Sequence, residues 1–388
     1  MKFKKVLLGE VCEISSSKRI FAKEYRPIGI PFYRGKEIIE KSKGNKVTTE
    51  LFISKERFEE IKKKNDVPRR GDILLTSVGT LGVPWLVDEE NFYFKDGNLT
   101  WLRSKTGLDH RYLFLWLNSP EAKRQVDSMC IGSTQKALTI ETLRKFSISL
   151  PSVEIQERIA NIMYSVANKI SLNQNINDNL EQQAQALFAN YYEHTDNETC
   201  FTDIIQILGG GTPKTGEISY WNGDIPFFTP KDVGTPYALN TEKSITESGL
   251  AHCNSKLYPV NTVFVTARGT VGKVGLAGVP MAMNQSCYAL VGKDINQLLV
   301  YFYTIKVVER LKHKASGAVF DAITTRDFES ERIKILTSET SIAFLSVAEP
   351  IFQQILCNSI ENQRLSALRD ALLPRLMSGE IDVSDIKI

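Results

Sequence analysis

Two short turns bracketed by glycine carry the residues whose types and spacing most clearly suggest chemistry. Gly79–Gly82 follows the strand-like run ILLTSV, and Gly269–Gly272 follows VFVTAR. Glycine permits a tight turn whose backbone N–H groups can approach a phosphate. A plain β-turn is the alternative, but polar neighbours favour contact with nucleic acid: Thr76, Ser77, Gly79, Thr80, Thr266, Arg268, Thr270 and Lys273. Arg268 is the strongest single candidate, because arginine can contact guanine bidentately.

Two polar loops further along the chain add a second set of candidates. The loop GSTQK spans 132–136, and its counterpart spans 316–321. Glutamine can pair bidentately with adenine, so Gln135 is a possible base reader, and an ordinary solvated loop is the alternative. The candidates from these loops are Ser133, Thr134, Gln135, Lys136 and Ser316.

Basic and hydroxyl residues elsewhere are weaker candidates, since a charge run is by default a solvated face. The glycine-rich stretch Gly209–Thr215 resembles a phosphate loop, but Glu217 stands where the Walker pattern needs lysine, so it predicts no ATP site. A structural Gly-Pro turn is the alternative there. These additional candidates are Ser17, Lys18, Arg19, Arg34, Lys36, Thr212, Lys214, Thr229 and Lys231.

An internal repeat places all of these residues on a common framework. IPFYRGKEI at Ile30 recurs as IPFFTPKDV 195 residues later, and GDILLTSVGTLG at Gly71 recurs as NTVFVTARGTVG 190 residues later. GSTQKALTIETL at Gly132 recurs as GAVFDAITTRDF 185 residues later. The order is preserved while the offset drifts, which is typical of two copies of one domain with different surface loops.

A heptad pattern follows each copy. Ile159, Val166, Asn173, Leu180 and Leu187 are spaced by seven, and the second tract repeats the spacing at Phe344, Ile351, Asn358, Leu365 and Leu372. Such stripes predict two coiled-coil helices of about 35 residues, the second ending at Leu373-Pro374. Two core helices of one globular domain are the alternative. The matched asparagines are a common device for fixing register, and an antiparallel pair would bring Asn173 and Asn358 close together at a pseudo-two-fold axis.

The predicted fold class is therefore α+β, with two duplicated domains of mixed α/β character separated by two long antiparallel coiled-coil helices in a pseudo-two-fold arrangement. We expect a first domain at residues 1–150, a central helix at 151–194, a second domain at 195–336, and a C-terminal helix and tail at 337–388. Two binding domains at a fixed separation would suit recognition of two half-sites on a duplex. The domain at 1–150 is called the first copy below, and that at 195–336 the second copy.

Several segments resemble the specificity subunits of type I restriction-modification systems. The resemblance rests on GGGTPKTGEISYWNGDIPFFTPKDV from Gly209, TARGTVGKVG from Thr266, FDAITTRDF from Phe320 and LPSVEIQERIANIM from Leu150. It covers essentially the whole chain in order. The first copy departs from it with SSSKRI in place of GGGTPKT, and the second helix lacks the EIQER wording.

This resemblance implies two target-recognition domains that each read half of a split DNA sequence, with the helices as spacer. It also implies partner subunits. Two modification subunits would transfer methyl from S-adenosylmethionine to adenine N6, and restriction subunits would use ATP and Mg. The chain itself would then hold no cofactor.

Composition and motifs limit the other function classes. Apolar residues make up 42% and charged residues 24%, and the net charge of +3 requires any DNA-binding charge to be local. No run of about 18 apolar residues and no signal peptide is recognisable, so we expect a cytoplasmic protein without a membrane span. The cysteines and histidines show no metal-ligand spacing, no PP dipeptide of an adenine methylase occurs, and Glu60-Ile61-Lys62 alone does not make a nuclease. We predict no catalytic residue. The alternatives are a free-standing bipartite DNA-binding protein, an unfamiliar enzyme and a structural scaffold.

Overall fold

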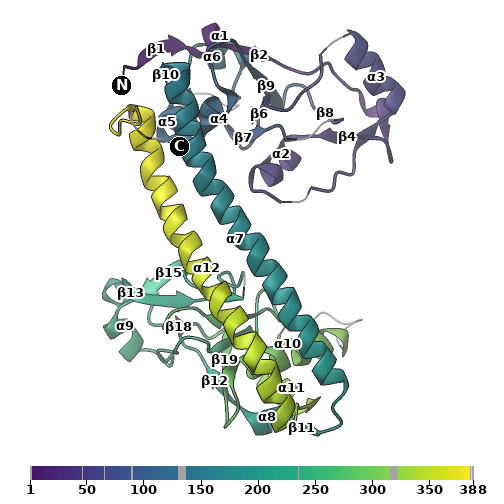
Figure 1. Cartoon of the computed structure of the whole chain (residues 1–388), viewed down its shortest axis with the longest axis vertical. Coiled ribbons are helices and arrows are strands. Elements are labelled where there is room, and N and C mark those ends of the chain that lie inside the picture. Colours follow the sequence, from purple (N-terminus) through teal and green to yellow (C-terminus); the bar gives the residue numbers. More distant parts are fainter. Residues whose placement is uncertain are drawn as a thin grey trace. The chain divides into compact units, whose positions relative to one another are not determined.

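The computed structural model describes residues 2–45, 47–64, 66–88, 91–129, 137–234, 236–314, 322–384 and 386. These residues form two compact units, one of Met1–Asn168 with Leu365–Ile388 and the other of Lys169–Arg364. The boundary between the units falls inside both long helices, α7 (Val153–Glu193) and α12 (Ser338–Ser378). Each unit therefore contains one copy of the repeat and a part of each helix (Figure 1).

The first copy is built on two four-stranded sheets, and a further two-stranded sheet pairs β1 with β10. Of the four-stranded sheets, one is antiparallel in the order β2-β9-β6-β7, and the other has the order β3-β5-β4-β8 with β4 and β8 parallel. Strand β6 is buried along its whole length, as expected for an apolar strand between two neighbours. In chain order the elements are β1 (Lys4–Leu7), α1 (Leu8–Val11), β2 (Cys12–Ser15), η1 (Ala22–Glu24), β3 (Tyr25–Arg26), β4 (Ile30–Tyr33), α2 (Gly35–Ser42), β5 (Phe52–Ile53), α3 (Lys55–Lys64), β6 (Ile73–Thr76), β7 (Pro84–Leu86), β8 (Tyr93–Phe94), β9 (Leu99–Ser104), α4 (His110–Asn118), α5 (Pro120–Met129), α6 (Ile140–Arg144) and β10 (Ser147–Leu150).

The second copy repeats this plan. Its main sheet has the order β12-β19-β16-β17-β14, and a smaller sheet has the order β15-β13-β18 with β13 and β18 parallel. Its elements are β11 (Glu198–Cys200), α8 (Phe201–Ile204), β12 (Ile205–Gly209), η2 (Ile218–Tyr220), β13 (Trp221–Phe228), β14 (Tyr237–Ala238), β15 (Lys243–Ile245), α9 (Glu247–Ala251), β16 (Val263–Thr266), β17 (Val274–Ala277), β18 (Ala282–Met283), β19 (Cys287–Gly292), α10 (Gln297–Lys314), α11 (Thr325–Glu329) and β20 (Arg332–Lys334).

The strand registers of the two copies match residue by residue. Thr76 faces Leu99 between β6 and β9, and Thr266 faces Cys287 between β16 and β19. In the smaller sheets Phe32 faces Tyr93, and Phe227 faces Ala282. The predicted α+β fold with a duplicated domain is confirmed.

Most apolar heptad residues lie in or against the cores of the units, with Ile159 and Phe344 fully buried. In the first unit Ile159 and Met163 of α7 share a core with Leu376 and Met377 of α12. In the second unit Phe188 of α7 and Phe344 of α12 lie with ring centroids 5.5 Å apart. Both helices run for 41 residues, longer than predicted.

The predicted end of the second helix at Leu373-Pro374 is wrong. Proline removes one helical hydrogen bond, but α12 continues through Pro374 to Ser378, because Leu376 and Met377 are buried in the core and hold the last turn. The helix ends at Gly379, whose φ of 77° is the left-handed conformation common just after a helix.

Four asparagines form a polar layer between α7 and α12 in the second unit. Asn173 Nδ2 donates to Asn362 Oδ1 at 2.9 Å, and Asn358 Nδ2 donates to Asn177 Oδ1 at 2.8 Å. The partner number falls by four as the residue number rises by four, so the helices run antiparallel. Asn173 and Asn358 were expected to lie close to each other. Both lie in this layer, and each bonds the asparagine one helical turn from the other, in two bonds related by local pseudo-two-fold symmetry.

Helix α12 is long and apolar enough, by length and composition alone, to cross a membrane. An 18-residue window of this helix has a mean hydropathy of 1.3, although polar residues interrupt it. The expectation of no membrane span rested only on unbroken apolar runs and therefore missed this property of the helix. Part of this apolar surface packs in the protein core, including Phe352 and Ile355. Other residues, such as Ile342 and Val347, are exposed.

The asparagine layer predicts coupled losses of stability. Asn177→Ala removes the Oδ1 atom that accepts the hydrogen bond from the buried Asn358 amide, which should lower the free energy of unfolding by about 1–3 kcal/mol. Because the two side chains bond each other, Asn177→Ala combined with Asn358→Ala should cost less than the two single losses added together. Urea unfolding of the full chain, compared by midpoint, measures this. The matched control is the exposed Asn175→Ala, which gains the same helix propensity; strictly additive losses would contradict the pairing.

Candidate nucleic-acid interface

The two glycine turns are shaped from inside by buried threonines. Thr76 Oγ1 accepts a hydrogen bond from the Val83 amide at 2.9 Å, and Thr266 Oγ1 accepts one from the Lys273 amide at 2.9 Å. Both threonine side chains are fully buried. Ser77 is also buried, with Oγ 2.6 Å from Thr100 Oγ1.

These three hydroxyl residues are therefore not retained as DNA contacts. Thr76, Ser77 and Thr266 were predicted as contacts because they flank the turns, yet their side chains hold the turns from the interior. A buried hydroxyl needs a partner within the fold, and each has one. The sequence could not separate this role from surface contact, since threonine serves both.

The tips of the turns are exposed and depend on glycine. Gly79 and Gly269 have φ of 80° and 81°, a left-handed conformation that other residues adopt at a cost. Thr80, Arg268, Thr270 and Lys273 are exposed beside them. Backbone and hydroxyl groups of the turns are thus at the surface, as an anion-binding turn requires.

One segment that the sequence analysis did not select organises the site in the first copy. Residues 95–98 connect β8 to β9, and the Lys95 amide donates to Tyr33 O at the end of β4 at 2.9 Å. Asn98 O accepts from the Ser77 amide at 2.8 Å, at the start of the glycine turn. Arg19 Nε bonds Asp96 Oδ2 at 3.2 Å.

The second copy repeats this arrangement in residues 284–286. The Asn284 amide donates to Phe228 O at 2.9 Å, and Ser286 O accepts from the Ala267 amide at 2.8 Å. Thr212 Oγ1 donates to Gln285 Oε1. We call residues 95–98 and 284–286 the hub segments. Each contacts three parts of its copy: the loop after β2 or β12, the end of the IPF strand and the glycine turn.

The end of the later polar loop also reaches the glycine turn in each copy. Ala137 forms an antiparallel bridge with Val78, and Ala322 forms one with Arg268. The loop candidates Ser133, Thr134, Gln135, Lys136 and Ser316 lie outside the described residues, so their contact with DNA stays a prediction.

A surface concavity of about 420 Å³ gathers several candidates in the second copy. Thr229, Lys231, Arg268 and Thr270 line it, although they come from segments about 40 residues apart. Hub residues Asn284 and Ser286 line it as well, together with Lys243. Lys231 Nζ lies 3.4 Å from Glu242 Oε2, whereas the Arg268 guanidinium has no hydrogen-bond or ion-pair partner among the described residues.

Two predicted candidates are tied to acidic residues at equivalent positions. Arg34 Nη2 bonds the buried Glu37 at 2.7 Å, and Thr229 Oγ1 donates to Asp232 Oδ2 at 2.7 Å. Burial acts to raise the pKa of Glu37, but the hydrogen bonds from Arg34 outweigh it and lower that pKa. These side chains shape the end of the IPF strand, which makes them weaker candidates for direct contact.

The remaining candidates lie at the surface. Ser17 is half-buried and donates to Phe94 O at 2.8 Å, while Lys18, Lys36 and Lys214 are exposed. In the glycine-rich stretch the backbone lies too close to neighbouring segments to leave room for a side chain. A Cβ on Gly210 would lie 2.1 Å from Asn284 O, and one on Gly211 would lie 2.6 Å from Asn254 N. This favours the structural alternative for the glycines, with Thr212 and Lys214 exposed just after them. Among the described residues no group of His, Cys, Asp or Glu could hold a metal ion.

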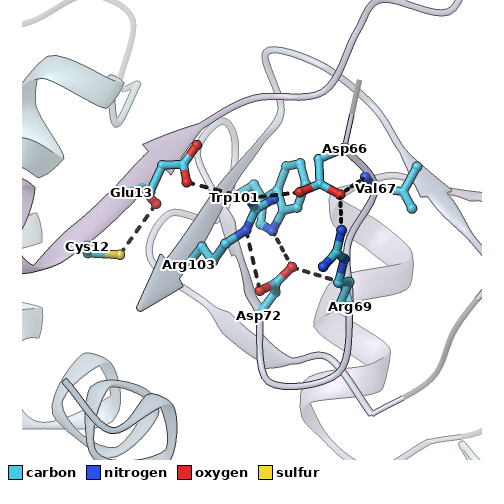
Figure 2. Close-up of polar contacts among 8 residues, drawn as sticks. All are labelled: Cys12, Glu13, Asp66, Val67, Arg69, Asp72, Trp101 and Arg103. Atoms are coloured by element: carbon cyan, nitrogen blue, oxygen red, sulfur yellow. Dashed lines mark hydrogen bonds and ion pairs between the residues drawn. The ribbon is translucent and has the colours of Figure 1, made fainter. Parts of the chain in front are cut away.

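A charged cluster fixes the opposite ends of the strands that carry the first copy's site (Figure 2). Arg103 Nη1 lies 3.0 Å from Asp66 Oδ2, and its guanidinium lies 4.3 Å from the ring centre of Trp101. Asp72 accepts from Trp101 Nε1 at 2.9 Å and from the Arg69 amide at 2.9 Å. Because Asp72 precedes β6 and Arg103 lies in β9, the cluster holds the register of the two strands whose other ends bear the glycine turn and the hub segment.

The comparisons with known proteins agree with this geometry. The family model described as type I restriction modification DNA specificity domain matches residues 1–182 and 197–341. The chain belongs to this family.

Relatives of this chain are named as specificity subunits of type I restriction enzymes. The type I restriction enzyme HindI specificity subunit of Haemophilus influenzae is 24% identical over 353 residues, covering 70% of this chain and 77% of the relative. The MjaIX specificity subunit of Methanocaldococcus jannaschii is 35% identical over 124 residues, 30% of this chain and 29% of its own. A solved structure of the S subunit from M. genitalium covers 97% of this chain with a TM-score of 0.61 at 14% identity, which supports the fold.

As a member of the specificity family, this chain is a non-catalytic DNA-recognition component of a type I restriction-modification system. The residues that sequence reasoning missed in it are the hub segments. Their signal was present: KDGN at 95–98 and NQS at 284–286 follow a short apolar run and precede another in both copies. Their polar turn composition resembles that of any loop, so only the hydrogen bonds distinguish them.

The charged cluster predicts a pH-dependent contribution to stability. Burial raises the pKa of Asp72; burial also acts to raise the pKa of Asp66, but Arg103 and Arg69 outweigh it and lower that pKa. Arg103 therefore favours folding while both carboxyls are ionised, and this advantage is lost as the pH falls through their pKa values. Arg103→Met, which keeps contact with Trp101, should lower the urea midpoint at neutral pH and less at about pH 3, because Asp72 takes up its proton first and Asp66, whose pKa is lowered, follows only at lower pH.

Tryptophan fluorescence measures this midpoint, because Trp85, Trp101 and Trp116 report on the first copy and only Trp221 on the second. The control is Arg70→Met, since Arg70 is exposed and, within the part of the chain that the structure describes, its side chain bonds only the Asp88 carbonyl. A loss of the same size at both pH values would show that the cluster acts through packing instead of charge.

Proposed function

We propose that each copy engages one half of a bipartite DNA target, and that the chain thereby directs adenine-N6 methylation and restriction by partner subunits. The observation that carries this proposal is the repeated hub arrangement. The same backbone hydrogen bonds join the same segments in both copies, while the exposed side chains on them differ. Recognition of two unlike half-sites requires a common backbone arrangement that presents different side chains to the bases.

Exposed apolar side chains on the long helices support the proposal that partner subunits dock there. Leu172 and Ile176 lie one turn apart on α7 and are 57% and 46% exposed, beside the buried Asn173 and Asn177. Apolar residues gathered on an exposed helix face usually mark an interface. We propose that modification subunits dock here, that restriction subunits join the same assembly, and that no membrane is involved.

The partners would also supply the cofactors. In this proposal the chain binds none, S-adenosylmethionine is held by the modification subunits, and ATP and Mg by the restriction subunits. The complex would act in the cytoplasm, where its DNA substrate lies. The two copies would contribute sequence recognition alone.

A single-molecule methylome of the host with and without this gene tests the proposal. Loss of N6-methyladenine from one motif, two short specified halves around an unspecified spacer, is the expected result. The gene and its neighbouring methylase must be expressed in the reference strain. An unchanged methylome in that strain would favour a free-standing DNA-binding protein instead.

Docking on α7 is tested by charge reversal of its apolar face. Leu172→Glu combined with Ile176→Glu should abolish co-purification with the neighbouring modification subunit, because two carboxylates cannot be buried in an apolar interface. Circular dichroism should show unchanged helix content, since both positions are exposed in this chain. The matched control is Ser171→Glu with Asn175→Glu, two exposed positions of the same helix. Equal co-purification of both double variants would place the interface elsewhere.

A further inference from the structure

The two copies place different side-chain pairs at the same position of their common frame. In the first copy Arg19, four residues past β2, bonds Asp96, two residues past β8. In the second copy Thr212 bonds Gln285, which lies two residues past β18. The registers make these pairs equivalent: Ser15 faces Trp101 and Leu208 faces Ala289 in the main sheets, and Phe32 faces Tyr93 as Phe227 faces Ala282 in the smaller ones.

Both pairs lie on the surface beside the glycine turn. The Arg19 side chain is 70% exposed, and Gln285 and Thr212 are exposed. Each pair is attached to a hub segment whose backbone bonds the first residues of the turn. A side chain here is held in place by the fold and remains accessible to a ligand.

The hydrogen-bonding capacity left on each pair differs. Asp96 engages Nε of Arg19, which leaves both terminal nitrogens with free N–H donors. Two parallel donors match guanine O6 and N7 in the major groove. Thr212 donates to Oε1 of Gln285, which leaves the Nε2 donors and a further lone pair on Oε1. One donor beside one acceptor matches adenine N7 and N6.

We propose that these pairs are equivalent base-reading positions, with Arg19 reading a guanine in one half-site and Gln285 reading an adenine in the other. This rests on the proposed function. Asp96 and Thr212 are positioning residues, since each fixes its partner's orientation and leaves the reading groups free. The carboxylate of Asp96 holds the guanidinium plane, and the hydroxyl of Thr212 holds the amide.

The experiment uses the full chain in complex with its modification subunit and a duplex carrying the methylome motif. Each guanine of the motif is replaced in turn by 7-deazaguanine and each adenine by 7-deazaadenine, which removes the N7 acceptor and keeps base pairing. Binding is measured at one fixed salt concentration. For wild type, one guanine and one adenine, in opposite halves, should each weaken binding at least about 5-fold when replaced.

The variants assign these positions to residues. Arg19→Ala should bind more weakly and no longer respond to the deaza-guanine, while it still responds to the deaza-adenine; Gln285→Ala should show the reverse. Each result is the ratio of a variant's affinity for the unmodified duplex to its affinity for the deaza duplex. A general loss of stability lowers both affinities alike and leaves this ratio unchanged. Arg70→Ala and Gln206→Ala, exposed residues of the first and second copies, should respond like wild type.

The positioning residues have their own outcome. Asp96→Ala should weaken binding, and combined with Arg19→Ala it should add almost nothing, because its effect passes through the guanidinium. An additive loss would mean that Asp96 contacts a base itself, and would overturn its assignment. Thr212→Val should weaken binding less than Gln285→Ala and keep part of the deaza-adenine response.

The outcomes separate this inference from the proposed function. If wild type recognises a bipartite motif but each variant responds to every replacement as wild type does, the reading assignment is wrong and the specificity role stands. The assignment is also wrong if the two responsive bases fall in the same half-site. If the gene determines no bipartite motif at all, the proposed function itself fails.

Discussion

The requirement that buried amides be hydrogen-bonded fixes the register of α7 against α12, and the cores of both units depend on that register. A slip of either helix by one residue would break both asparagine bonds, leaving polar groups unpaired at an apolar seam. It would also misplace the apolar residues on either side, since Ile159 and Met163 serve one core and Phe188 serves the other. The polar layer contributes less stability than leucine would, but it selects one alignment.

Within each copy the frame of the candidate site is held mainly by backbone bonds. The bonds from Lys95 and Asn284, and those accepted by Asn98 and Ser286, involve main-chain atoms alone. Main-chain bonds do not depend on side-chain identity, so residues on the hub segments can change without loss of the frame. The exposed pairs therefore differ in chemistry, ionic in one copy and neutral in the other, on the same geometry.

The sequence predicted much of this fold because its signals are periodic. The internal repeat and the heptads of α7 and α12 are regular over long stretches, and both were recovered with their order and pairing direction. Misses occurred where one residue type serves opposite roles. Thr76 and Thr266 are polar but buried, because their hydroxyls satisfy amides inside a turn, and Pro374 lies inside a helix because packing outweighs one lost bond.

The candidate site was predicted less completely because it is assembled by contacts between distant segments. Arg19 and Thr212 were selected as isolated polar residues, whereas their partners Asp96 and Gln285 lie more than 70 residues away. No periodicity links such positions. The hub segments became recognisable only as the common partner of three elements, which is a property of the folded chain.

Charge balance limits what this site contributes to binding. The chain's net charge is +3, and several cations at the two sites already face carboxylates, among them Arg19, Arg34 and Lys231. Each neutralised phosphate adds to salt-dependent affinity, so contacts to the DNA backbone fall to exposed cations that have no ion-pair partner among the described residues, such as Lys18, Lys214 and Arg268. Discrimination among bases does not depend on phosphate contacts, because it arises from bidentate contacts at base edges. The cations already held by carboxylates are thus better suited to selecting a sequence than to neutralising phosphates, and the two tasks fall to different side chains of the same site.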